Sequence, residues 1–293
     1  MTLWVILISF IVILSTGASI GVGLGLSSAI VLYCVLDMPL VVVVQRMFTS
    51  VDSFSFMAVP FFMLAGAFMS EGGVTKRIVD FSMAMVGALA GGLALVVAVA
   101  GMFFAALSGS SAATTAAIGS SMIDEMERRG YPRSFAAAVV ASGGTVGIVI
   151  PPSITMVVYG SIANTSIADL FMAGFVPGIL MGVTMCVVSW VISKKNGYQG
   201  EGKFSLGRLL RSVRECFWAL MMPVIILGGI YSGIFTPTEA AAVAAVYGAL
   251  VGLFIYRELK IKDLPRTLLN AAYNTTMIMF VVGASNVFGW ILT

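Results

Sequence analysis

The sequence predicts an all-α protein that crosses a membrane several times, and its composition and charge pattern carry that prediction. Of the 293 residues, 59% are hydrophobic and 10% are charged, and the mean hydropathy is +1.05. Soluble chains carry roughly 25% charged residues, so this chain could not cover a soluble surface. Its charges are bunched, and most of the uncharged stretches between them can hold a span of about 20 residues. These stretches are residues 1–36, 81–123, 134–168, 170–193, 216–238, 240–256 and 267–293.

The first uncharged stretch, residues 1–36, differs from a secretory signal peptide in three respects. It has no basic start, no clear small-residue cleavage site and a longer apolar run than a signal core. We therefore expect it to remain in the protein as membrane helix. The path of residues 1–70 stays open, because Asp37, Arg46 and Asp52 give little charge asymmetry.

The basic residues predict the orientation, since Lys and Arg favour cytoplasmic loops. They gather at Lys76–Arg77, Arg128–Arg133, Lys194–Arg214 and Arg257–Arg266. We expect these four loops to share the cytoplasmic side of a lipid bilayer. The net charge of +3 reflects these loops and indicates no nucleic-acid partner. The stretch from Lys194 to Glu215 fits either a helix on the lipid surface or a solvated linker.

The longest uncharged stretch, residues 81–123, has a polar, glycine-containing centre. Polar backbone at membrane depth is tolerated only when it is buried in protein or faces a watery cavity. We therefore predict a re-entrant hairpin over residues 90–123 with its tip at this centre. The candidate site residues at the tip are Ser108, Gly109, Ser110, Ser111 and Thr114, with Thr115 beside them.

The stretch from 134 to 168 contains glycines and prolines that a continuous helix does not favour. Each Pro costs roughly 3 kcal/mol in a helix interior and each Gly about 1 kcal/mol. The sequence therefore predicts an interrupted helix over residues 134–163, with two half-helices joined by unwound backbone. The candidate site residues here are Gly143, Gly144, Thr145, Gly147, Pro151, Pro152 and Ser153.

Two interrupted elements at membrane depth indicate the binding site of a secondary transporter. Hydroxyl and carbonyl oxygens suit a small cation. We expect sodium rather than a proton, because neither interrupted element contains Asp, Glu or His. A competing interpretation is that the small residues only let helices pack closely. The sodium candidates are Ser108, Ser110, Ser111, Gly144 and Thr145.

No Arg or Lys lies in the middle of a long apolar run, so backbone N–H groups, hydroxyls and helix N-termini would have to hold a carboxylate substrate. Asp169 and Glu239 stand three positions after Ser166 and Thr236, and we interpret them as helix-capping residues. The chain has no His, and its three Cys show no pairing spacing. We expect no metal centre, no disulfide and no cofactor other than sodium as a coupling ion.

Six segments spread along the chain form a series that is more specific than any one of them. They are Val59–Gly66 (VPFFMLAG), Phe103–Ala113 (FFAALSGSSAA), Arg129–Tyr131 (RGY), Gly144–Ser153 (GTVGIVIPPS), Leu170–Gly178 (LFMAGFVPG) and Gly233–Ala242 (GIFTPTEAAA). In this order the series resembles the large membrane subunit of tripartite ATP-independent periplasmic (TRAP) transporters, the DctM-type permease.

This resemblance implies an elevator-type fold of the ion-transporter superfamily, built from inverted repeats, in a bacterial or archaeal inner membrane. It implies sodium-coupled uptake of an organic acid, such as a C4-dicarboxylate or a sialic acid. The expected partners are a periplasmic substrate-binding protein, which delivers the acid, and a small TRAP membrane subunit.

By the same resemblance, the chain divides into N-terminal scaffold helices (1–80), one half of the transport domain (81–165), a returning helix with a cytoplasmic arm (166–215) and the start of a second repeat (216–293). The hairpin tip and the interrupted helix would carry the first half of the ion and substrate site. Thr293 closes an uncharged run, so we expect the second repeat to be incomplete and this chain alone not to transport.

Three other functions stay open at this point. One is an ion-coupled organic-anion carrier of the same superfamily that works without a binding protein, and another is a passive channel. The third is a membrane enzyme with Ser108 or Ser110 as its nucleophile. The enzyme is least favoured because a serine nucleophile needs a base, while the chain has no His and no Lys within its apolar runs.

Overall fold

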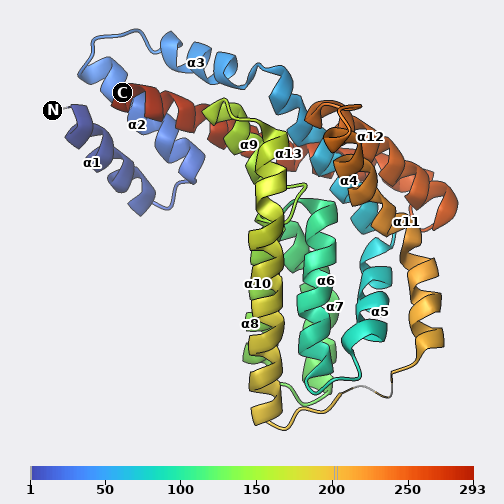
Figure 1. Cartoon of the computed structure of the whole chain (residues 1–293). Coiled ribbons are helices and arrows are strands. Elements are labelled where there is room, and N and C mark those ends of the chain that lie inside the picture. The colour runs from blue at the N-terminus through green and yellow to red at the C-terminus, as the bar shows by residue number, and fades with distance from the viewer. Residues whose placement is uncertain (1, 201, 203) are drawn as a thin grey trace. The chain divides into compact units, whose positions relative to one another are not determined.

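The computed structural model describes residues 2–200, 202 and 204–293. Residues 1, 201 and 203, which belong to the expected scaffold helices and cytoplasmic arm, lie outside the described residues. Every regular element in the described ranges is a helix (Figure 1). The α-helices are α1 (Thr2–Ser15), α2 (Ile20–Cys34), α3 (Val41–Val51), α4 (Ala58–Glu71), α5 (Val74–Val86), α6 (Gly92–Ser108), α7 (Ser111–Arg128), α8 (Arg133–Thr145), α9 (Ile154–Ala163), α10 (Ile167–Lys195), α11 (Leu206–Tyr231), α12 (Pro237–Leu250) and α13 (Leu264–Leu292). The short elements are the 3₁₀ turns η1 (Phe54–Met57), η2 (Val146–Ile148) and η4 (Ile261–Asp263), and the π-helix η3 (Val251–Ile255).

Five helical segments of the described chain are long and apolar enough to cross a membrane. They are Phe54–Glu71, Ile167–Lys195, Leu206–Tyr231, Pro237–Ile255 and Ile261–Leu292. This finding confirms the predicted all-α, multi-pass class. The elevator arrangement and the inverted repeats stay predictions.

The helices form two compact units. One comprises Met1–Met57 with Ala272–Thr293, and the other comprises Ala58–Ala271. These two units do not test the expected division into four functional segments after residues 80, 165 and 215, which stays a prediction. Its last boundary falls inside α11, which runs without a break from Leu206 to Tyr231. The arginines expected in an arm therefore form the first turns of a long helix.

In the first unit, α1 and α2 replace the longer membrane helix expected from residues 1–36. Gly17 separates them with a left-handed backbone (φ +83°), and neither helix exceeds 15 residues. Leu32 and Val43 form a buried core with Val287 of α13. A Cβ at Gly21 of α2 would lie 2.8 Å from the Phe280 ring of α13, so the helices meet closely.

The second unit is a helical bundle with α6 at its centre. Fourteen of the 17 residues of α6 are buried, because α4, α5, α7, α8 and α10 all pack against it. Figure 1 shows α10 running alongside α6. On the other side of the bundle, α12 packs against both α4 and α11. This burial of α6 fixes the first arm of the hairpin.

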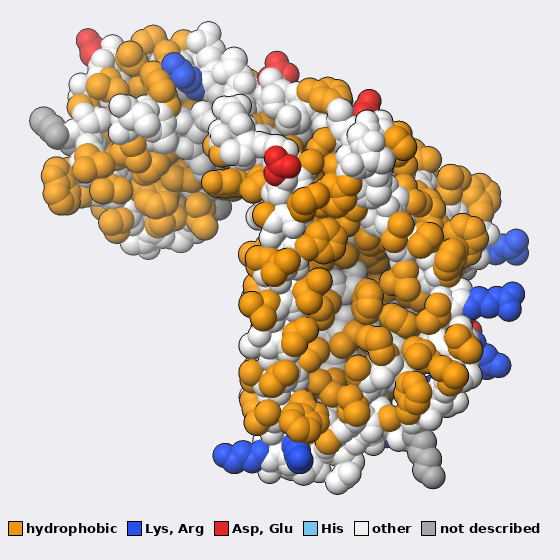
Figure 2. Space-filling view, viewed as in Figure 1, with side chains coloured by type: hydrophobic (Ala, Val, Ile, Leu, Met, Phe, Trp, Pro, Cys, Tyr) orange, Lys and Arg blue, Asp and Glu red, His pale blue; other side chains and the backbone are white. Residues whose placement is uncertain are grey.

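The helix α10 has chemically different ends that suit a membrane span. Its 29 residues extend for about 43 Å, which exceeds a hydrocarbon core of about 30 Å. Asp169 lies in its first turn, and Lys194 and Lys195 lie in its last, as the helix dipole favours. Figure 2 shows hydrophobic side chains over the visible side of α10 and basic side chains at its lysine end.

Both predicted helix caps are confirmed. The Ser166 hydroxyl accepts a hydrogen bond from the Asp169 N–H at 3.2 Å at the start of α10. At the start of α12, the Glu239 carboxylate accepts from the Thr236 N–H at 2.8 Å, and the Thr236 hydroxyl accepts from the Glu239 N–H at 3.3 Å. The second pair is a complete capping box with Pro237 at the first helical position.

Replacement of Thr236 by Ala tests this capping box. We expect T236A to cost about 1 kcal/mol and to lower the apparent melting temperature of the detergent-purified protein by about 2–4 °C. The control is T184A, which removes an exposed hydroxyl that bonds only to the Leu180 carbonyl of its own helix. Equal melting temperatures for the two variants would contradict the assignment.

Candidate functional site

The chain reverses direction at the hairpin tip between α6 and α7. Gly109 ends α6 in the left-handed region (φ +57°), and Ser110 is extended. The Ser110 hydroxyl accepts from the Ala113 N–H at 3.4 Å, so Ser110 caps α7. A Cβ at Gly66 of α4 would lie 3.3 Å from the Ser108 Cα, so this glycine lets α4 approach the tip.

Three polar residues form the tip cluster, which we define as Ser108, Ser110 and Thr114. The hydroxyl oxygens of Ser108 and Thr114 lie 2.9 Å apart. The Ser110 carbonyl accepts from the Thr114 hydroxyl at 2.8 Å and from the Ser108 hydroxyl at 3.3 Å. Thr114 is fully buried and Ser108 is 4% exposed. The hairpin therefore concentrates three oxygen atoms within hydrogen-bonding distance of one another.

The second element is interrupted where its glycines and prolines predict a break. The helix α8 ends at Thr145, the turn η2 follows, and α9 begins at Ile154. The peptide bond between Pro151 and Pro152 is cis. The Ser153 hydroxyl donates to the Ile148 carbonyl at 2.8 Å, which gives one carbonyl freed by the break a partner.

The hairpin tip and the break bond to each other through their backbones. The Ile154 N–H at the start of α9 donates to the Gly109 carbonyl at 3.1 Å. A Cβ at Gly109 would lie 2.8 Å from the Pro152 carbonyl oxygen, and one at Gly147 would lie 2.9 Å from the Ser110 carbonyl oxygen. These two glycines are therefore required for the contact between the elements.

The remaining candidate glycines also permit close approach. A Cβ at Gly144 would collide with the Thr115 hydroxyl and lie 3.1 Å from the Ser111 carbonyl oxygen. A Cβ at Gly101 of α6 would lie 3.2 Å from the Gly143 carbonyl oxygen. The end of α8 thus packs against both arms of the hairpin.

Thr145 lies apart from the tip cluster. Its hydroxyl donates to the Ser142 carbonyl at 2.7 Å, and its side chain lines a cleft of about 520 Å³ that Phe135 and Thr184 also line. The structure thus brings Ser108, Ser110, Ser111 and Gly144 to the tip, while the fifth sodium candidate faces the cleft between α8 and α10.

The sequence analysis missed a glycine stripe on α10 that supports the break. A Cβ at Gly174 would lie 2.7 Å from the Val149 carbonyl oxygen, and one at Gly178 would lie 2.6 Å from Cγ1 of Ile150. One turn further, a Cβ at Gly182 would collide with the Met102 side chain of α6. Small residues repeated every four positions are the signal that could have revealed this packing surface.

The residues of the tip cluster contain only neutral oxygen groups and no titratable side chain. Such oxygens can coordinate a hard cation, and the N-termini of α7 and α9 beside them favour an anion. Buried interrupted helices, polar tips and long apolar spans define a polytopic membrane protein of the transporter type.

Comparison with known proteins identifies the family. The sequence profile described as "Tripartite ATP-independent periplasmic transporter, DctM component" matches residues 7–293. The chain therefore belongs to the DctM component family of these transporters, and the predicted resemblance is confirmed. Membership of this permease family, together with the membrane-capable helices, places the chain in the inner membrane and among transporters rather than enzymes.

Three curated relatives illustrate the similarity. The C4-dicarboxylate TRAP transporter large permease protein DctM of Pseudomonas aeruginosa is 48% identical over 85% of this chain and 58% of its own length. The isethionate TRAP transporter permease protein DctMQ of Oleidesulfovibrio alaskensis is 46% identical over 97% of this chain and 45% of its own length. The sialic acid TRAP transporter large permease protein SiaM of Vibrio cholerae is 39% identical over 85% of this chain and 58% of its own length. The chain thus spans about half of the length of these relatives.

Replacement of Gly147 by Ala tests the contact between tip and break. The added Cβ would meet the Ser110 carbonyl, which is fixed backbone, so we expect a cost of about 1–3 kcal/mol and a lower apparent melting temperature. The matched control is G228A inside α11, where a Cβ meets nothing within 4 Å. There Ala should be neutral or stabilise by up to about 1 kcal/mol. A G147A protein as stable as wild type would refute the close contact.

Proposed function

We propose that this chain supplies the first half of the ion and substrate site in the large membrane subunit of a TRAP transporter. The whole protein would take up an organic acid together with sodium. One observation carries the proposal: the hairpin tip, which holds the tip cluster, is joined at Gly109 by a backbone hydrogen bond to the break between α8 and α9. Two interrupted elements that meet in this way are the arrangement expected around a transporter site.

Sodium fits the tip cluster by chemistry and by spacing. A cation of this size binds oxygens at about 2.4 Å, which puts neighbouring ligand oxygens about 3.4 Å apart in an octahedral shell. The three oxygens of the cluster already lie 2.8–3.3 Å apart. Small rotations of the two hydroxyls would turn their hydrogens outward and open one face of a coordination shell. Gly147 borders this position, because a Cβ there would lie 2.9 Å from the Ser110 carbonyl oxygen and 3.0 Å from the Thr114 hydroxyl oxygen.

The substrate class follows from the relatives and from the helix ends. The relatives are named for C4-dicarboxylate, isethionate and sialic acid, which are all organic anions. At the N-termini of α7 and α9, the Ala113 N–H donates to the Ser110 hydroxyl and the Ile154 N–H donates to the Gly109 carbonyl. The other N–H groups of these two first turns lack helical partners. They would receive an anionic group beside the sodium ion. Part of the anion site would come from the remainder of the longer protein.

The partners are proposed from the family alone. A periplasmic substrate-binding protein would deliver the acid, and a small TRAP membrane subunit would complete the complex in the lipid bilayer. The chain itself supplies neutral oxygens and helix ends, which recognise an anion without an internal Arg or Lys.

The test is uptake by the full-length parent protein, reconstituted in proteoliposomes with its small subunit and binding protein. We expect uptake to require a sodium gradient, and T114V to raise the half-saturating sodium concentration by about tenfold, the equivalent of about 1.4 kcal/mol. The control is T276V, because both threonine hydroxyls donate to the carbonyl four residues earlier but Thr276 is exposed. If the two variants had the same half-saturating sodium concentration, the sodium ion would not bind at the tip cluster.

Other outcomes discriminate the remaining functions. Uptake that is indifferent to sodium would overturn the coupling assignment. Uptake without the binding protein would indicate a standalone carrier, and downhill flux that never accumulates substrate would indicate a channel.

A further inference from the structure

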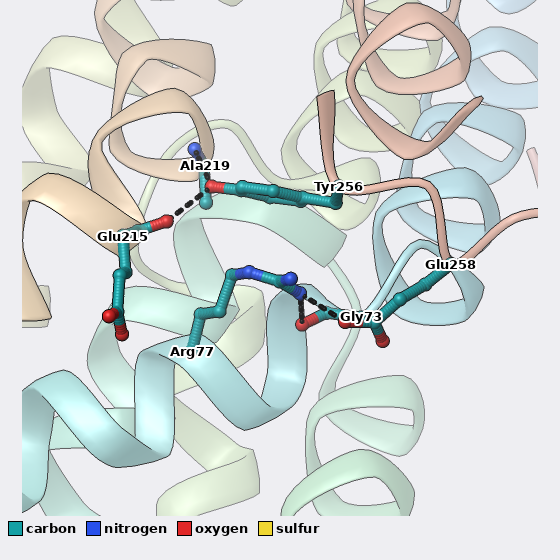
Figure 3. Close-up of polar contacts among 6 residues, drawn as sticks. All are labelled: Gly73, Arg77, Glu215, Ala219, Tyr256 and Glu258. Atoms are coloured by element: carbon teal, nitrogen blue, oxygen red, sulfur yellow. Dashed lines mark hydrogen bonds and ion pairs between the residues drawn. The ribbon is translucent and has the colours of Figure 1, made fainter. Parts of the chain in front are cut away.

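A tyrosine hydroxyl is inserted into the backbone hydrogen bonding of α11 (Figure 3). In a regular α-helix the Ala219 N–H would donate to the Glu215 carbonyl, four residues earlier. Here the Ala219 N–H donates to the Tyr256 hydroxyl at 3.1 Å, and that hydroxyl donates to the Glu215 carbonyl at 3.0 Å. One side chain thus bridges two backbone groups that are each other's usual partners.

The helix α11 is weakened at this turn by its own sequence. Pro223 has no N–H, so the Ala219 carbonyl has no helical donor, and the proline ring crowds that carbonyl. The adjacent Trp218 carbonyl accepts from the Tyr247 hydroxyl at 2.7 Å. Two tyrosines from the segment of α12 and η3 therefore bond to one turn of α11, where side-chain insertion favours a bend.

The π-helix η3 and an arginine of α5 hold Tyr256 in place. The Tyr256 N–H donates to the Val251 carbonyl, five residues earlier, at 2.8 Å. The Arg77 guanidinium lies 3.9 Å from the centre of the Tyr256 ring, and its Nη1 donates to Glu258 at 2.7 Å and to the Gly73 carbonyl at 2.8 Å. Figure 3 shows Arg77 beneath the ring, with both acceptors next to the same end of its guanidinium.

We propose that Tyr256 and Arg77 form a latch that positions α11 relative to α5, the helix that leads into the hairpin. When the latch is closed, the hydroxyl bridges the Ala219 N–H and the Glu215 carbonyl, an insertion that favours a bend at this turn. When it opens, the Ala219 N–H and the Glu215 carbonyl bond to each other. Neither backbone group loses a partner in this exchange, and only the Tyr256 hydroxyl gives up its two hydrogen bonds when the latch opens. The contacts of Arg77 bias it toward the closed state.

Whether the latch is closed or open depends on the distance between α5 and α11. If α5 moves away, Arg77 leaves the Tyr256 ring and the hydroxyl loses its support. The first turns of α11 can then swing about Ala219 while the apolar remainder stays packed on α12. Leu210 lies nine residues before Ala219, or about 13 Å along the helix. A change of about 20° in the bend would therefore move Leu210 by about 4–5 Å.

The experiment measures this swing in the full-length parent protein. Spin labels replace two exposed residues, Leu210 of α11 and Arg128 at the end of α7. Pulsed electron–electron double resonance then gives the distribution of distances between the two labels. Y256F removes only the hydroxyl and keeps the ring beneath which Arg77 stacks. We expect it to shift or broaden the distribution by about 4 Å. The matched control, Y231F, changes a tyrosine at the end of the same helix and should leave the distribution unchanged.

A second variant keeps the inference testable if Y256F does not fold. R77K retains the positive charge but loses the planar stacking surface, and it should shift the distribution in the same direction. Wild-type distributions in both variants, or an equal shift in Y231F, would overturn the latch. The distances do not depend on the proposed transport function. Absence of sodium-driven uptake in the wild type would reject that function and leave the latch standing.

Discussion

The hydrogen bond from the Ile154 N–H to the Gly109 carbonyl is the interaction on which the site depends. Backbone groups at membrane depth have no water to bond, so every break in a helix must be satisfied within the protein. The hairpin exposes a carbonyl at its tip, and α9 exposes an N–H at its start. Each element supplies what the other lacks, which explains why neither is expected to be stable at membrane depth alone. The tip cluster of Ser108, Ser110 and Thr114 exists at that junction because the backbones are held there.

Close backbone approach then determines which residue types can surround the junction. Gly109 and Gly147 lie where a Cβ would strike carbonyl oxygens, and Gly174 and Gly178 bring α10 against the residues of the break. Helices in a membrane gain most from such van der Waals packing. The buried α6 provides the fixed surface against which these contacts form. Glycines therefore stand where backbones come closest to the polar cluster, with Gly66 beside Ser108 and Gly147 beside Thr114.

Features with a local physical cause could be predicted from the sequence. The break around Gly147 and Pro151, the hairpin tip and the cap by Thr236 all follow from residues close together in the chain. The two short helices in place of one span over residues 1–36 were not predicted, because Gly17 alone gave too weak a signal against an apolar background. The direction of Thr145 toward the cleft depends on how α8 packs against α10. The hydrogen bonds of the Tyr256 hydroxyl with α11 join residues about forty positions apart, so no local sequence pattern predicts them.

The electrical neutrality of the tip cluster has a consequence for the energetics of a transport cycle. In the proposed transport cycle, Ser108, Ser110 and Thr114 would bring no charge of their own, so any charge that this half-site carried through the membrane would belong to its cargo. A membrane potential acts on a moving charge with about 2.3 kcal/mol per elementary charge per 100 mV. The voltage would then act on the net charge of the ions and substrate bound to the loaded half-site. The empty half-site carries no charge, so its return would not depend on the voltage. A carboxylate in this position would have reversed that asymmetry and made the empty return the voltage-sensitive step.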